Sequence, residues 1–102
     1  MKQISATELN HILSEITLID VREHDELAIC QIDSAIHIPM GDILNRHSEL
    51  DKDAKIVVMC HHGRRSAFVC NQLSSLGFND VTNLSGGIDA WSVEVDNSIT
   101  RY

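Results

Sequence analysis

One cysteine, Cys60, lies where a thiol can do chemistry. It follows the β-branched run Lys55–Met59 and precedes a short polar loop that leads into a helical pattern. The carboxyl ends of strands and the N-termini of helices are where α/β proteins bind ligands, and a helix N-terminus favours the ionised form of a thiol. The sequence therefore predicts an enzyme with Cys60 as its nucleophile.

The charge pattern around Cys60 indicates an anion-binding site. The chain has a formal net charge of −7, yet there is no Asp or Glu between Ala54 and Asn79. That acid-free segment holds basic or imidazole side chains at Lys55, His61, His62, Arg64 and Arg65. A core strand and a buried helix would account for the missing acids. They would not account for two adjacent arginines in a loop that we expect to expose its cysteine.

The loop itself can lower the pKa of the Cys60 thiol. A free cysteine has a pKa of about 8.5, so only a few per cent is thiolate at neutral pH. If the loop wraps round the sulfur, the backbone N–H groups of residues 61 to 66 point inward and form an anion-binding nest continuous with the helix N-terminus. Gly63 supplies a backbone conformation that is costly for other residues in so tight a turn. The nest, Arg64 and Arg65 all favour the thiolate.

Composition describes an ordinary soluble globule. A chain of 102 residues, with 43% hydrophobic and 23% charged residues, predicts a single domain over residues 1–102. Three cysteines without a C-x-x-C pair argue against a disulfide framework. There is no apolar run of membrane-spanning length and no signal-peptide pattern, so we expect a cytoplasmic monomer. The acidic net charge argues against nucleic acid and anionic membranes as partners.

The pattern of elements predicts an α/β fold. Helices are expected at about 5–14, where Ser5 and Glu8 form a capping box, at 25–29, at 42–47 after Asp42, from Ser66 to Gly77, and around Trp91. Strands are expected at 17–21, 35–38, 55–59 and 81–84. The tail from Val93 has no clear pattern. Strands that alternate with helices predict one open, mostly parallel sheet with helices on both faces.

Four segments together resemble a known family. They are Leu18–Glu23, Ala35–Pro39, Cys60–Ser66 and Leu84–Trp91, and they cover nearly the whole chain. In this order and spacing the chain resembles a single-domain rhodanese, a sulfurtransferase, and its loop matches the C-x-x-G-x-R pattern of that family in full. The resemblance implies a rhodanese-like, five-stranded sheet and sulfur transfer through a Cys60 persulfide. It implies neither a metal nor an organic cofactor.

The resemblance also implies roles for individual residues. Residues His61, His62, Gly63, Arg64, Arg65 and Ser66 would bind the persulfide and a small anionic donor such as thiosulfate, and Arg65 matches the arginine of the motif. Asp20 and Arg22 would support the loop, with Asp20 accepting hydrogen bonds from it and Arg22 forming ion pairs. An ordinary charge pair at a strand end is an equal alternative. The acceptor would be cyanide in an assay and a thiol or a partner protein in the cell.

Three other readings stay open. His61 and His62 suggest zinc, but adjacent residues rarely bind one ion and further ligands at a recognisable spacing are missing. A phosphatase or arsenate reductase would use a loop with five residues between cysteine and arginine, whereas four separate Cys60 from Arg65. The smaller ring suits a single extra sulfur. A non-catalytic module that carries a persulfide or docks a partner is the third reading.

Overall fold

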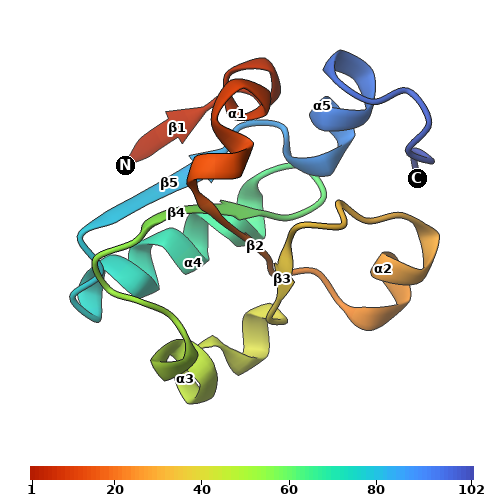
Figure 1. The fold of residues 1–102 in the computed structure, drawn as a ribbon. Coiled ribbons are helices and arrows are strands. Elements are labelled where there is room, and N and C mark those ends of the chain that lie inside the picture. The colour runs from red at the N-terminus through yellow and green to blue at the C-terminus, as the bar shows by residue number, and fades with distance from the viewer.

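An open sheet of five strands forms the centre of the molecule (Figure 1), and the computed structural model describes all residues from 1 to 102. The strand order is β1-β5-β4-β2-β3, and every neighbouring pair is parallel. The strands are β1 (Lys2–Ile4), β2 (Thr17–Asp20), β3 (Ile36–His37), β4 (Lys55–Met59) and β5 (Asp80–Leu84). The predicted α/β fold with an open, five-stranded sheet is confirmed, and the sheet is wholly rather than mostly parallel.

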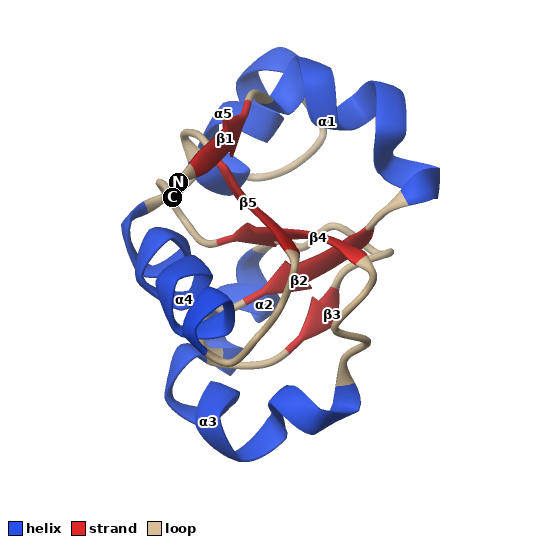
Figure 2. Ribbon diagram, turned by 90° about the vertical axis from the view of Figure 1, so that its left-hand side faces the viewer, coloured by secondary structure: helices blue, strands red, loops and turns tan.

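Helices cover both faces of the sheet, as predicted (Figure 2). On one face lie α1 (Ala6–Ile12) and α5 (Gly87–Glu94), and on the other lie α3 (Ile43–Arg46) and α4 (Arg64–Ser75). The short helix α2 (His24–Ile29) follows β2 and buries no residue fully. Short 3-10 turns at Leu13–Glu15, Met40–Asp42 and His47–Glu49 extend or connect these helices. None of the helices combines the length and the apolar character that crossing a membrane requires.

The alternation of side chains along β4 explains the two cores. Ile56 and Val58 are fully buried against α3 and α4, while Val57 and Met59 are fully buried against α1 and α5. Each such side chain contributes about 1.5–3 kcal/mol relative to an exposed position. Cys60 continues the alternation and points to the α4 side. The packing of β4 thus fixes the face of the sheet on which the thiol lies.

The structure differs from the sequence-based elements at three points. Strand β1 had no place among the predicted elements, because Lys2–Ile4 is only three residues long and largely polar. Helix α4 begins at Arg64, directly after Gly63, so Ser66 is a buried residue of the first turn and not the N-cap. Asp42 stands at the N-cap of α3 but makes no side-chain capping bond.

Candidate active site

Cys60 lies at the carboxyl end of β4, and the three residues that follow it lead directly into α4. Gly63 makes the sharp turn possible, because its φ of +106° lies in the left-handed region that side chains disfavour. A Cβ at this position would also lie 3.4 Å from backbone atoms of Leu84 and Gly86. The loop therefore places the sulfur at the N-terminus of a twelve-residue helix.

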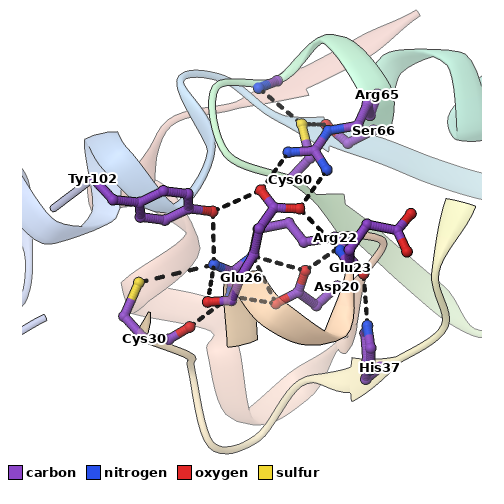
Figure 3. A network of polar contacts seen from close by, with 11 residues as sticks. Asp20, Arg22, Glu23, Glu26, Cys30, His37, Cys60, Arg65, Ser66 and Tyr102 are labelled. Carbon is purple, nitrogen blue, oxygen red and sulfur yellow. Dashed lines mark hydrogen bonds and ion pairs between the residues drawn. The ribbon is translucent and has the colours of Figure 1, made fainter. Parts of the chain in front are cut away.

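A backbone N–H and a hydroxyl lie within hydrogen-bond distance of the sulfur of Cys60 (Figure 3). The N–H of Gly63 donates to Sγ at 3.1 Å, and Oγ of Ser66 lies 3.3 Å from Sγ. Burial raises the pKa of Cys60, but the Ser66 hydroxyl and the N–H groups of Ser66, Gly63 and His62 lower it more. The net effect is a pKa below the ordinary value of a thiol. Of the N–H groups of residues 61 to 66 that the sequence suggested would face the sulfur, those of His62, Gly63 and Ser66 act on it.

One expectation about Cys60 is wrong. The sequence suggested an exposed cysteine, but the residue is only 1% exposed and belongs to the core on the α4 side. The reason is that its Cβ follows the inward alternation of β4, while the exposed side chains of the loop are those of His62 and Arg64. The thiol faces the loop amides instead of open solvent, so a reagent must approach through the loop.

Backbone carbonyls of the loop point outward, which is why its N–H groups can face the sulfur. The N–H of Ile88 donates to the carbonyl of Cys60 at 2.9 Å, and the N–H of Asp89 donates to that of His61 at 3.2 Å. Both donors belong to the first turn of α5. They come so close because Gly87 has no side chain: a Cβ there would collide with the carbonyls of Cys60 and His61. Gly87, the first residue of α5, therefore shapes the cysteine loop as well as its own turn.

Asn83, a buried residue of β5, orients the other side of the loop. Its Nδ2 donates to the carbonyl of Gly63 and to Oε1 of Gln3, each at 3.1 Å. These two acceptors fix the orientation of the amide, so Oδ1 faces Ser66 and accepts from its hydroxyl at 2.5 Å. Because the hydroxyl carries a single hydrogen, Asn83 and the Cys60 sulfur compete for it.

Arg65 forms a bidentate ion pair with Glu26 of α2. Nη1 and Nη2 of Arg65 lie 2.7 and 2.8 Å from the two carboxylate oxygens, and both side chains are partly buried. The hydrogen bonds from Arg65 are the main reason that the pKa of Glu26 falls to about 2. Arg64, in contrast, is exposed and takes part in no ion pair. The arginine of the motif is thus already paired with an acid.

Asp20 and Arg22 form a buried ion pair beneath the loop (Figure 3). Nη2 of Arg22 lies 2.8 Å from Asp20, and both side chains are almost fully buried. Arg22 also donates to the carbonyl of Cys30 at 2.8 Å and to the hydroxyl of Tyr102 at 2.9 Å. The expectation that Asp20 accepts hydrogen bonds from the cysteine loop is wrong, because its carboxylate binds the side chain and N–H of Arg22 instead.

Tyr102 joins the site from the far end of the chain. Its ring stacks on His61 with centroids 3.7 Å apart, and His61 in turn stacks on His62 at 3.8 Å. Its hydroxyl donates to Glu26 at 2.9 Å while it accepts from Arg22. Nothing in the patternless tail indicated this placement. Glu26 was equally hidden within a charged run, whereas a polar Asn83 in a buried strand was a readable signal.

His61, His62 and Asp89 are the side chains that could hold a metal ion, since their ligand atoms lie within 4.8 Å of one another. Two features oppose this use. The ring of His61 is stacked between His62 and Tyr102, and Asp89 accepts from Arg101 at 2.9 and 3.1 Å. A metal would have to rearrange the stack and displace Arg101.

Comparison with known proteins assigns the family. Residues 5–94 match the model of the rhodanese-like domain. The chain is 43% identical to YtwF of Bacillus subtilis, covering 92% of this chain and 93% of YtwF. It is 33% identical to the thiosulfate sulfurtransferase GlpE of Coxiella burnetii, covering 88% and 86%. It is 34% identical to the sulfur carrier protein YrkF of Bacillus subtilis over 76% of this chain, but only 42% of that longer protein.

Solved structures agree with this assignment. A rhodanese-related protein from Thermoplasma volcanium superimposes with a TM-score of 0.87 at 36% identity, covering 93% of this chain and 94% of the other. A rhodanese-like domain protein from Staphylococcus aureus superimposes with a TM-score of 0.86 at 32% identity, covering 100% and 99%. With its fold, its loop and these matches, the chain belongs to the rhodanese-like domain family.

Proposed function

We propose that this protein is a sulfurtransferase that carries a sulfane sulfur on Cys60 as a persulfide. The observation that carries the proposal is the ring of donors around Sγ, with the N–H of Gly63 at 3.1 Å and a thiol pKa below its ordinary value. Such a ring holds a thiolate, and the N–H groups at the N-terminus of α4 would also attract the negative charge on the outer sulfur of a persulfide. The relation to GlpE supports the same chemistry.

The reaction is a two-step transfer. The Cys60 thiolate attacks the outer sulfur of a donor such as thiosulfate, a new S–S bond forms, and sulfite leaves with the electrons of the broken bond. In the second step an acceptor, cyanide or a thiolate, attacks the outer sulfur of Cys60–S–S⁻, and the Cys60 thiolate is released. Neither step requires a proton from a general acid, since nucleophile and leaving groups are all anions. No metal or organic cofactor has a part in this scheme.

A second candidate is a carrier that loads sulfur but passes it only to a partner protein. Two observations favour it: Cys60 is 1% exposed, and the chain is related to the sulfur carrier YrkF. A small thiol would then reach the outer sulfur slowly. A phosphatase has less support, since the loop has four residues between Cys60 and Arg65 and carries the ion-paired Arg65.

Intact-protein mass spectrometry after treatment with thiosulfate tests the proposal. We expect a gain of one sulfur atom, its removal by cyanide with formation of thiocyanate, and no gain in Cys60→Ser. Cys30→Ser is the matched control and should load as the wild type does. Undiminished loading of Cys60→Ser would refute the assignment of the nucleophile. Loading that neither cyanide nor a small thiol reverses would favour the carrier.

A further inference from the structure

The carboxylate of Glu26 is saturated with donors, which holds it firmly against Arg65. Oε2 accepts from Nη1 of Arg65 at 2.7 Å and from the N–H of Glu23 at 2.9 Å. Oε1 accepts from Nη2 of Arg65 at 2.8 Å and from the hydroxyl of Tyr102 at 2.9 Å. Each carboxylate oxygen thus accepts two hydrogen bonds, and the four donor groups belong to Arg65, Glu23 and Tyr102. Glu26 cannot turn away from Arg65 without losing several of these bonds at once.

Acidic partners compensate nearly all positive charge around the loop. The ion pairs near Cys60 are Arg22–Asp20, Arg65–Glu26 and Arg101–Asp89. Arg64 alone has no acidic partner there, and its side chain is exposed to solvent. The remaining attraction for an anion therefore comes from the loop amides and from Arg64. Because Arg64 is solvated, it contributes little binding energy.

This balance of charge should favour some sulfur donors over others, according to the charge that each sulfur donor carries. Thiosulfate carries two negative charges and must approach a thiolate, which is a third. Glu26, whose side chain is 16% exposed, neutralises much of the charge of Arg65, and thiosulfate could gain that charge in full only by displacing it. That displacement would leave a partly buried carboxylate without its cation, which is unfavourable. A persulfide R–S–SH with an uncharged body carries no charge in its protonated form, and that form meets none of this repulsion.

We propose that Glu26 is a specificity-determining residue for the sulfur donor. By neutralising Arg65, it selects an organic persulfide with an uncharged body over dianionic thiosulfate. The inference rests on the proposed persulfide chemistry of Cys60. In the favoured step, the Cys60 thiolate attacks the outer sulfur of R–S–SH. The Cys60 S–S bond forms, the bond from the inner to the outer sulfur of the donor breaks, and R–S⁻ leaves with the electron pair while the proton stays on the transferred sulfur.

Glu26→Gln tests the proposal directly. Glutamine keeps the shape of the side chain and can still serve as the N3 residue of the capping box of α2, but it lacks the charge. The second-order rate constant for sulfur gain on Cys60 is measured with two donors, thiosulfate and 2-hydroxyethyl persulfide. We expect the variant to react about tenfold faster with thiosulfate and to stay within about twofold with the persulfide.

Glu49→Gln is the matched control. It removes the same charge from an exposed pair with Arg46, outside the network around Cys60, and should change neither rate constant by more than about twofold. An equal change of both rate constants in Glu26→Gln, or no change with thiosulfate, would overturn the inference. Failure of the wild type to load Cys60 from either donor would instead refute the proposed function.

The wild-type protein alone gives a second test, which remains valid if Glu26→Gln folds poorly. Raising the ionic strength weakens whichever interaction dominates between donor and site. If Glu26 neutralises Arg65, the loading by thiosulfate should accelerate as salt is added, because repulsion is being screened. If Arg65 attracts the donor, loading should slow down, and that result would overturn the inference. The persulfide reaction serves as the reference and should respond little.

Discussion

At the scale of single residues, the pKa of Cys60 is the quantity to measure. Loop donors lower it despite burial, so the thiolate fraction at neutral pH should exceed that of free cysteine. The rate of alkylation by iodoacetamide, followed by peptide mapping from pH 4 to 10, should have a midpoint below about 8.5. Burial can slow the reaction at every pH without moving the midpoint.

Cys70 provides the internal control for this titration. It is buried in the core of the α4 side, and burial raises the pKa of Cys70 to about 12. Its peptide should therefore remain unmodified over the same pH range in the folded protein. A midpoint for Cys60 at or above that of free cysteine would contradict the role given to the loop amides.

A second prediction at this scale concerns the stability and the Cys60 pKa of the variant Asn83→Ala. Asn83→Ala removes the acceptor of the buried Ser66 hydroxyl and one of the two donors to the carbonyl of Gly63, the other being the N–H of Ala67. The two lost hydrogen bonds should cost about 1–3 kcal/mol together. Urea unfolding should report that loss. The hydroxyl hydrogen of Ser66 is then free to turn to Sγ, so the pKa of Cys60 should fall further.

Asn79→Ala is a suitable control, because Asn79 is exposed and its bond to Asp53 lies at the surface. It should change the free energy of unfolding by no more than about 0.5 kcal/mol. An unchanged Cys60 pKa in Asn83→Ala would mean that the hydroxyl of Ser66 already donates to the sulfur in the wild type.

At the scale of elements, the contact between α5 and the cysteine loop can be broken with one methyl group. Gly87→Ala would drive a Cβ into the carbonyls of Cys60 and His61, at a position whose φ of +59° already disfavours side chains. We expect a loss of stability of about 2 kcal/mol or more, together with weaker sulfur loading. Chemical denaturation and mass spectrometry measure the two effects.

Gly41→Ala is the control for this change, because a Cβ at Gly41 would meet no atom within 4 Å. Its stability should match that of the wild type or slightly exceed it, since alanine restricts the unfolded chain. If Gly87→Ala proved as stable as Gly41→Ala, the close packing of α5 on the loop would not be what shapes the site.

The elements also explain how far the sequence could predict the site. Strand β4, Gly63 and the start of α4 are local features, readable from periodicity and from residue types within a few positions of Cys60. The partners of the loop are distant in sequence: Glu26 and Arg65 are separated by 39 residues, and Ser66 and Asn83 by 17. Packing selects such pairs among many candidates, so no local pattern could identify them. The short strand β1 exists for the same reason, because only its pairing with β5 makes it a strand.

At the scale of the whole molecule, the Glu26–Arg65 pair should make stability depend on pH. The pKa of Glu26 is about 2 in the folded protein and near 4.5 ordinarily, so its contribution is complete above pH 4.5 and is lost as the pH falls towards 2. The difference in unfolding free energy between wild type and Glu26→Gln should be on the order of 2 kcal/mol at neutral pH and shrink below pH 4.5. Urea unfolding at several pH values measures it.

Glu15→Gln is the control here, since Glu15 is exposed and forms no ion pair. Its difference from the wild type should be small and nearly constant with pH. If the Glu26→Gln difference were equally constant, the ion pair with Arg65 would not contribute to the stability of the folded chain.

The hydrogen bonds from α5 and β5 to the cysteine loop have a consequence for the order of events during folding. The carbonyls of Cys60 and His61 find their donors in residues 88 and 89, and the carbonyl of Gly63 accepts from Asn83 as well as from Ala67 of α4. Strand β5 must take its place between β1 and β4 to present the donors that lie in residues 83 to 89. A chain still emerging from the ribosome, with its last quarter unmade, would lack these donors, and its Cys60 should titrate as an ordinary thiol with a pKa of about 8.5. The activation of the thiol is therefore a property of the completed sheet and not of the cysteine loop by itself.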